Sequence, residues 1–266
     1  MINMDEKNAY KTFRIASIRP DNYRVKTFTL DGALEAKPGQ FCMVWIPRLN
    51  EKPFSIMNAD PLTFNIAAVG EFSNKLHELA VGDKITLRGP YGNGFALTGK
   101  EKKVLLVGGG YGVAPLYFFA KKCLAQKIEP VMVIGARNEQ DVLLEKDFTE
   151  EGVRVVVTTD DGSKGIKGFA TVAAQAELDA GGVDAVFACG PEKMMAALAR
   201  LCKDKNIPCQ VSLERYMGCG MGICGKCVCG GQRVCADGPI FPGEEALKEN
   251  DFGQKSRDAS GATKTL

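Results

Sequence analysis

The stretch "VLLVGGGYGVAP", residues 104 to 115, places a run of glycines between an apolar segment and a segment with helical spacing. The apolar segment predicts a buried strand, and Pro115 falls in the first turn of the helix, where its missing N–H costs little. A phosphate group can lie in such a turn against backbone amides. Val113 stands where a dinucleotide fingerprint expects its third glycine, so a tight structural turn is the alternative.

The residues after this turn continue to alternate between strands and helices. Further apolar runs occur in "EPVMVIGAR", "VRVVVTTDDG" and "DAVFACG", and helical spacing returns near residues 171–179 and in "EKMMAALARLCKDK". Uninterrupted apolar strands of this kind are typical of a parallel sheet, and we predict an α/β domain over residues 100–208. Cys189, in "ACGPEKMM", falls at the carboxyl end of a strand, where open α/β sheets bind ligands.

The residues before the turn are rich in short strands. "TFRIASIR", "RVKTFTL", "FCMVWI", "LTFNIAAV" and "KITLRG" are separated by turn residues, with one short helix near residues 73–80. This pattern predicts a small antiparallel β-barrel domain over residues 1–99. Lys52 and Ser55 offer a cation and a hydroxyl, while Gly70 and Ser73 stand ahead of the short helix. Ordinary turn chemistry is the alternative for each of them.

Near the C-terminus, "MGCGMGICGKCVCGGQRVCADG", residues 217–238, holds five of the ten cysteines. The order C-x4-C-x2-C followed by a later cysteine is the plant-type arrangement for a [2Fe–2S] cluster. It selects as ligands Cys219, Cys224, Cys227 and Cys235. Glycines between them suit a backbone that wraps closely around a cluster. Cys229, separated from Cys227 by a single residue, is poorly placed to be a ligand and is not selected.

Two alternatives remain for these thiols. A structural zinc site uses the same thiolates, but zinc loops usually contain paired C-x2-C knuckles and only one occurs here. A redox-active dithiol would be expected at a helix N-terminus after a strand. We assign residues 209–244 to the cluster region, and we predict that the polar tail, residues 245–266, is mobile at its end.

Composition limits the function classes further. The 266 residues are 45% hydrophobic and 25% charged, and the net charge of +2 gives no nucleic-acid or membrane-surface footprint. The start "MINMDEKNAYK" does not read as a secretory signal, so a cytoplasmic location is expected, where thiols stay reduced. His77, the only histidine, excludes a Rieske centre and is expected to be structural or solvent-facing.

Taken in order, the barrel, "KPFS", "GPYGNGF", "GGGYGVAP" and "CGP" resemble the ferredoxin–NADP reductase superfamily over residues 10–205. The C-terminal "CGMGICGKCVCGGQRVCADGPIF" narrows the resemblance to the electron-transfer subunits of dihydroorotate dehydrogenase B. Single motifs of this kind are weak, but the ordered set is specific and covers nearly the whole chain.

The resemblance implies roles for particular residues. The segment that holds FAD corresponds to Lys52, Pro53, Phe54 and Ser55, and the loop over the FAD diphosphate to Gly70, Phe72 and Ser73. The nicotinamide-nucleotide loop corresponds to Gly108, Gly109, Gly110, Gly112, Val113, Ala114 and Pro115, and the segment beside the nicotinamide to Cys189, Gly190 and Pro191. Cys189 is thereby the candidate catalytic residue. Lys52 departs from the usual arginine and loses its bidentate fork.

The resemblance also implies an activity. A partner chain oxidises dihydroorotate on FMN, in pyrimidine biosynthesis, and its electrons pass through the [2Fe–2S] cluster and FAD to NAD⁺. The implied assembly is a heterotetramer with two copies of each chain. The protein would position cofactors rather than donate catalytic side chains.

Two other readings stay open at this point. The first alternative is a related function: the chain would be the flavin and iron–sulfur subunit of an NADP-dependent ferredoxin reductase or of a sulfide dehydrogenase-type complex. Cys219 disfavours one such subunit, which carries aspartate there, whereas Arg137 could contact a 2′-phosphate. The second alternative is a protein that is not an enzyme, either a cofactor-binding regulator or a zinc-stabilised module without turnover. This alternative leaves both glycine loops unexplained.

Overall fold

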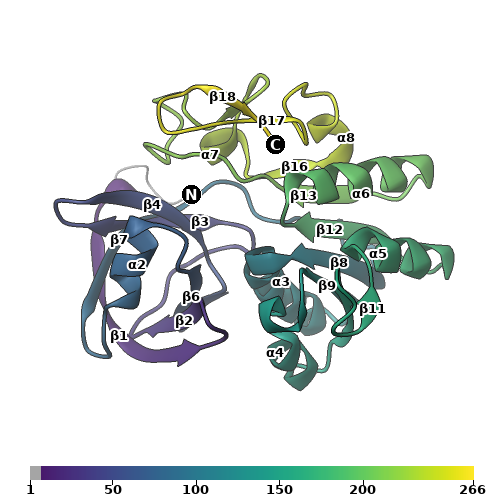
Figure 1. Cartoon of the computed structure of the whole chain (residues 1–266), viewed down its shortest axis with the longest axis horizontal. Helices are drawn as coiled ribbons and strands as arrows, with labels where there is room; N and C mark the ends of the chain where they lie inside the picture. The colour runs from purple at the N-terminus through teal and green to yellow at the C-terminus, as the bar shows by residue number, and fades with distance from the viewer. Residues whose placement is uncertain (1–6) are drawn as a thin grey trace.

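An antiparallel sheet of seven strands forms the first part of the chain in the computed structural model, which describes residues 7–266 (Figure 1). Its order is β4-β3-β7-β1-β2-β6-β5. The elements of this part are β1 (Lys11–Pro20), β2 (Val25–Leu30), β3 (Phe41–Ile46), β4 (Asn50–Ser55), β5 (Asn58–Ala59), β6 (Leu62–Ala67), α2 (Glu71–His77) and β7 (Lys84–Tyr91).

The first sheet and α2 share one hydrophobic core. Side chains from β1, β2, β3, β6, β7 and α2 pack in a single cluster, with Phe28, Phe64 and Leu87 fully buried. The prediction of a barrel is correct in strand content but wrong in closure. Within the described residues the end strands β4 and β5 do not pair with each other, so the sheet stays open. Pro53 in β4 lacks an N–H and suits an edge strand, and β5 has only two residues.

A second sheet of seven strands follows, in the order β11-β10-β9-β8-β12-β13-β16. All its neighbours are parallel except β16, which runs antiparallel to β13. Its strands are β8 (Lys103–Gly109), β9 (Glu129–Ala136), β10 (Arg154–Thr159), β11 (Ile166–Lys167), β12 (Ala185–Cys189), β13 (Cys209–Ser212) and β16 (Ile240–Pro242). The predicted α/β architecture is confirmed.

Helices cover both faces of the second sheet, because its strands are apolar on both sides. Two helices, α3 (Val113–Ala125) and α4 (Glu145–Glu150), pack on one face, and α5 (Ala170–Asp179) and α6 (Glu192–Asp204) pack on the other. Short 3₁₀ turns occur at η1 (Gly110–Gly112) and η2 (Glu139–Asp141).

The strand order reverses between β8 and β12. From β8 the chain continues to β9 and β10 on one side, and β12 and β13 lie on the other. The carboxyl ends of β8 and β12 are therefore neighbours, with Cys189 in register with Gly108. Such a switch point is where open α/β sheets bind ligands.

Aromatic contacts join the two sheets. Phe95, from "GPYGNGF", lies 5.1 Å from Phe119 of α3 and 5.8 Å from Phe187 of β12, measured between ring centroids. Buried aromatic pairs of this type are worth about 0.5–1.5 kcal/mol each beyond their area. The turn that follows the first sheet is thereby fixed to the second.

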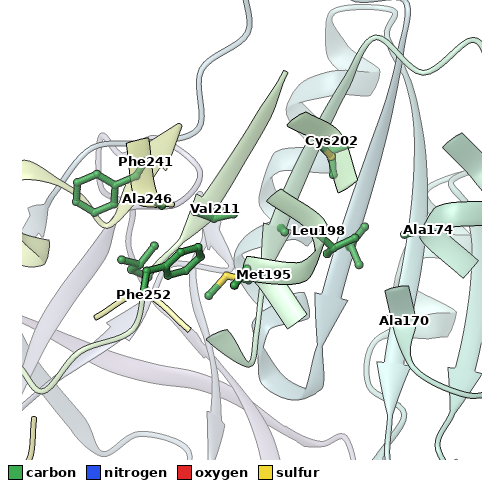
Figure 2. Close-up of a cluster of buried hydrophobic side chains, with 14 of the residues drawn as sticks. Ala170, Ala174, Met195, Leu198, Cys202, Val211, Phe241, Ala246 and Phe252 are labelled. Carbon is green, nitrogen blue, oxygen red and sulfur yellow. The ribbon is translucent and has the colours of Figure 1, made fainter. Parts of the chain in front are cut away.

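The cysteine-rich segment lies between β13 and β16 and continues into a C-terminal segment that extends over both sheets (Figure 1). Its small elements are β14 (Val228–Cys229), β15 (Gln232–Arg233), α7 (Val234–Asp237), α8 (Gly243–Ala246), β17 (Lys255–Arg257) and β18 (Thr263–Thr265). Near the end of the chain β17 pairs with β18 as a hairpin, and the mobility of this end stays a prediction. Phe252 is buried next to Met195 of α6 (Figure 2).

Among the described residues, no helix is both long enough and apolar enough to span a membrane.

Candidate cofactor sites

The glycine loop after β8 and the segment after β12 meet at the switch point. A Cβ atom on Gly112 would lie 2.3 Å from the carbonyl oxygen of Cys189, and one on Gly109 would lie 2.6 Å from Cδ of Pro191. Only glycine allows this approach of two backbones. The structure thus brings the two predicted nicotinamide-nucleotide segments together, and α3 begins immediately after the loop at Val113.

Cys189 is a half-buried thiol at this junction. Burial raises its pKa to about 12, although a hydrogen bond with Ser212 acts in the opposite direction. The side chain is therefore a neutral thiol at physiological pH, and it lacks the thiolate that a cysteine nucleophile needs. Its place at the carboxyl end of β12, where open α/β sheets bind ligands, is suited to packing against a bound group.

The two predicted FAD segments also meet. Lys52 to Ser55 lie on edge strand β4, and Phe54 stacks on Phe72 with ring centroids 6.1 Å apart and planes at 25°. A Cβ atom on Gly70 would have no heavy atom within 4 Å, so the backbone there is open to close approach. Lys52 places its Nζ 4.4 Å from the ring centroid of Tyr216, a residue of the cysteine-rich segment.

The Ser73 hydroxyl is hydrogen-bonded to the backbone of its own turn. Its Oγ accepts hydrogen bonds from the backbone N–H of Val69 at 2.9 Å and of Gly70 at 3.1 Å, and it donates to the Gly70 carbonyl. The hydroxyl therefore shapes the start of α2, in a buried position. Any contact with a diphosphate would come from the exposed backbone of this turn.

The four predicted cluster ligands form two pairs of neighbouring thiols. Cys219 lies within hydrogen-bonding reach of Cys224, and Cys227 of Cys235. The N–H of Gly222 donates to Cys235 Sγ at 3.1 Å and thereby ties the first turn to the second pair. Across residues 7–266, however, no three His, Cys, Asp or Glu side chains are arranged closely enough to hold a metal ion.

Backbone donors favour thiolates in this loop. Although burial acts against it, N–H groups including those of Cys224 and Ile223 lower the pKa of Cys219 to about 7. The hydrogen bond with Cys235 lowers the pKa of Cys227 to about 6 and raises that of Cys235. Four sulfur donors, three of which accept hydrogen bonds from backbone N–H groups, fit an iron–sulfur cluster, which needs thiolate ligands with hydrogen bonds to sulfur.

The loop has a buried side and a solvent side. Cys227 and Cys235 are buried, Cys219 is half-buried and Cys224 is exposed, while the neighbouring Ile223 is 80% exposed. A cluster on these ligands would lie close to the molecular surface at Cys224.

Arg88 links this loop to the first sheet. Its guanidinium donates to both carboxylate oxygens of Glu51, at 2.8 and 2.6 Å, and to the Cys219 carbonyl at 2.7 Å. Nearby, a Cβ atom on Gly220, whose φ is +73°, would lie 2.7 Å from Cγ of Met43 in β3. The first predicted ligand position is therefore held directly against β3 and β7, next to the strand that carries the predicted FAD segment.

Comparison with known proteins places the chain in a family. Residues 214–247 match the iron–sulfur cluster binding domain of dihydroorotate dehydrogenase B, and residues 106–200 match the oxidoreductase NAD-binding domain. A protein of Methanocaldococcus jannaschii named "Probable dihydroorotate dehydrogenase B (NAD(+)), electron transfer subunit" is 44% identical over 93% of this chain and 95% of its own. A Pyrococcus furiosus protein of the same name is 42% identical over 91% and 94%.

The chain belongs to this family. The resemblance inferred from the ordered motifs is thereby confirmed. A solved structure described as the NADH-dependent reduced ferredoxin–NADP oxidoreductase of flavin-based electron bifurcation superposes with a TM-score of 0.79. It is 30% identical and the match covers 92% of this chain and 94% of that one. The ferredoxin reductase of carbazole 1,9a-dioxygenase, at 24% identity, 75% and 66% coverage and a TM-score of 0.66, shares the fold.

The contacts of two other residues singled out in the sequence, His77 and Arg137, are also seen in the structure. His77 donates from Nε2 to the Ile66 carbonyl at 2.8 Å, so it has the structural role that was expected. Arg137 is largely exposed and pairs with Asp141 at 2.9 Å, and its proposed contact with a 2′-phosphate stays a prediction.

Sequence reasoning missed three residues that tie the cysteine loop to the rest of the family fold: Arg88, Arg215 and Tyr216. Arg88 and Arg215 are each only 5% exposed. The ammonium of Lys52 lies over the ring of Tyr216. Nothing in the sequence marks a charged side chain as buried, because the partners that compensate it come from distant segments.

Proposed function

We propose that the chain is the electron-transfer subunit of a dihydroorotate dehydrogenase B. It would take electrons from an FMN-containing catalytic subunit that oxidises dihydroorotate in pyrimidine biosynthesis, and deliver them to NAD⁺. The observation that carries this proposal is the position of the cysteine loop. The loop leaves and rejoins the nucleotide-binding sheet at β13 and β16, and Arg88 bonds it to the sheet that carries the FAD segment.

Residues 1–99 would bind FAD. We assign Lys52, Pro53, Phe54 and Ser55 to one side of it and the Gly70, Phe72 and Ser73 turn to its diphosphate. The stacked rings of Phe54 and Phe72 support this assignment, because they hold the two segments side by side. Lys52 would supply positive charge as a point cation without the fork of an arginine.

Residues 100–208 would bind the nicotinamide nucleotide. The loop from Gly108 through Gly109, Gly110 and Gly112 to Val113, Ala114 and Pro115 would hold its phosphates at the N-terminus of α3. Cys189, Gly190 and Pro191 would lie beside the nicotinamide, where the neutral Cys189 thiol would orient the ring rather than attack it. The switch-point position of both segments supports this role.

Residues 209–244 would hold the [2Fe–2S] cluster through Cys219, Cys224, Cys227 and Cys235, ahead of the C-terminal segment, residues 245–266. With its cofactors bound, the chain would exchange single electrons at the cluster and a hydride with NAD⁺ through FAD. The exposed surface around Cys224 and Ile223 would face the catalytic subunit. We propose a heterotetramer with two copies of each chain, located in the cytoplasm, consistent with ten free cysteines.

The test is an anaerobic visible spectrum of the purified chain before and after NADH, and then NADPH. A yellow-brown protein whose flavin and iron–sulfur bands are both bleached by NADH is the expected result. Mixing with the FMN-containing subunit and dihydroorotate should bleach the same bands. A colourless protein that binds zinc after reconstitution with flavin, iron and sulfide would refute the proposal.

A second candidate function is the corresponding subunit of an NADP-linked ferredoxin reductase. It is favoured by the 92% coverage of this chain by the ferredoxin–NADP oxidoreductase structure. The same spectra separate the two candidates, because bleaching by NADPH alone, or no response to dihydroorotate with the catalytic subunit, would favour the reductase.

A further inference from the structure

Cys229 has no place in the ligand set, yet it is completely buried in the cysteine loop. Its side chain has a cation as its hydrogen-bond partner. Nη2 of Arg215 donates to Cys229 Sγ at 3.0 Å. Cys229 is only two positions beyond the ligand Cys227, so a restraint on Cys229 also restrains that ligand.

Arg215 is held in place by a buried carboxylate. Its guanidinium forms an ion pair with Glu192 through two contacts, one of them Nη2 to Oε2 at 3.1 Å, and the two side chains are 1% and 5% exposed. The carbonyls of Glu214 and Lys255 accept further hydrogen bonds at 2.8 and 3.3 Å. A buried guanidinium with this many partners has one favourable position, because moving it would leave charge unpaired.

Glu192 connects this network to the nucleotide-binding unit. It stands in the first turn of α6, immediately after the segment ending at Pro191 that packs against Gly109. Its Oε2 also accepts the N–H of Gly253 at 3.0 Å. Met195 of α6 and Phe252, next to Gly253 in the chain, are both buried and belong to one hydrophobic cluster (Figure 2).

We propose that Cys229 and Arg215 are positioning residues for the iron–sulfur cluster. Arg215, oriented by Glu192 at the start of α6, fixes Cys229 by a hydrogen bond and so holds the Cys227 end of the loop in place. Cys229 binds no iron in this arrangement. The inference rests on the proposed function, because it takes Cys219, Cys224, Cys227 and Cys235 as the cluster ligands.

The test compares Cys229→Ala, which removes the acceptor, with Cys229→Ser, which keeps one. Cys123→Ala is the matched control, since Cys123 is an equally buried thiol in α3, outside the loop. Each cofactor-loaded protein is assayed for iron and acid-labile sulfide, for the electron paramagnetic resonance spectrum of the reduced cluster, and for the rate of iron transfer to a ferrous chelator under anaerobic conditions.

We expect all variants to form the cluster with the parent spectrum, and Cys229→Ala to lose it about tenfold faster, as expected for loss of one hydrogen bond to a charged group. The rate of iron loss from Cys229→Ser should return toward that of the parent, and the rate from Cys123→Ala should equal that of the parent. Equal rates in parent and Cys229→Ala, or a serine variant as fast as alanine, would overturn the inference.

Two other outcomes are decisive. A Cys229→Ala protein without iron, or with an altered spectrum, would show that Cys229 does more than position the loop and would also overturn the inference. A parent protein that binds no iron and sulfide on reconstitution would instead overturn the proposed function, so the two failures are distinguishable.

Discussion

Replacing Arg88 with methionine should destabilise the protein strongly. Methionine keeps most of the apolar length of the side chain but removes every hydrogen-bond donor. The Glu51 side chain, 16% exposed, would lose its two hydrogen bonds from Arg88 and keep only the one from the Tyr10 hydroxyl. The Cys219 carbonyl and the Tyr91 hydroxyl would each lose a partner. Removal of one member of a buried ion pair costs about 3–5 kcal/mol, because the other charge stays buried without compensation.

The measurement is thermal unfolding of the cofactor-loaded protein, followed by circular dichroism. A change of 1 kcal/mol shifts the midpoint of a chain of this size by about 2–4 °C, so Arg88→Met should melt about 6–20 °C lower than the parent. Adding Glu51→Gln to Arg88→Met should recover part of the loss, because no uncompensated charge remains. Arg19→Met is the control, since that ion-paired arginine is 50% exposed and should matter by about 1 kcal/mol or less.

The reasoning would be refuted by an Arg88→Met protein that melts within about 2 °C of Arg19→Met, a difference below 1 kcal/mol. It would also fail if the double variant were no more stable than the single one. In the first case the Arg88 guanidinium would contribute no more to stability than an exposed ion pair does. In the second the cost would come from packing and not from buried charge.

Three further predictions concern the nucleotide crevice and the one histidine. Gly112→Ala should lower NADH affinity about tenfold, since its Cβ would lie 2.3 Å from the Cys189 carbonyl and overpacking costs about 1–3 kcal/mol; an unchanged anaerobic NADH titration would contradict this. Cys189, with its pKa raised to about 12 by burial, should be alkylated at pH 7.5 far more slowly than a free cysteine, as site-resolved mass spectrometry can measure. His77 should titrate by NMR below its ordinary value of 6.5, because burial lowers its pKa. The stability from its neutral ring is present above about pH 6.5 and lost as the pH falls through the folded-state pKa, so a stability profile flat over this range relative to His77→Gln would contradict the assignment.

Elements set by local patterns could be predicted from the sequence. The strand at Phe41–Ile46, the buried strand before Gly110 and the helix after it all occur where apolar runs, glycines and Pro115 placed them. Each signal is contained within about a dozen residues, so tertiary context had little opportunity to override it. The contact between the Gly112 loop and Cys189 follows from two such units being parallel neighbours.

Elements set by distant contacts could not be predicted. The segment Asn50–Ser55 is polar and contains Pro53, so it resembles a turn, but pairing with β3 makes it an edge strand. Arg88 alternates with apolar neighbours as a solvent-facing residue would, and its partner Cys219 lies 131 positions away. The burial of its charge depends on that partner, and no periodic pattern records it.

The cysteine loop depends on both halves of the molecule at once. Its ends belong to the second sheet through β13 and β16, and Cys219, the first proposed ligand, is bonded by Arg88 to the first sheet, where we propose that FAD binds. Its later part is bonded through Arg215 to the start of α6. Arg88 and Arg215 therefore connect different parts of one loop to different parts of the molecule, to β7 of the first sheet and to α6 beside the second. With the cluster on the proposed ligands, we expect a substitution at either arginine to alter it without replacing a ligand. Comparison of the two variants distinguishes movement of the loop relative to the first sheet from movement relative to α6.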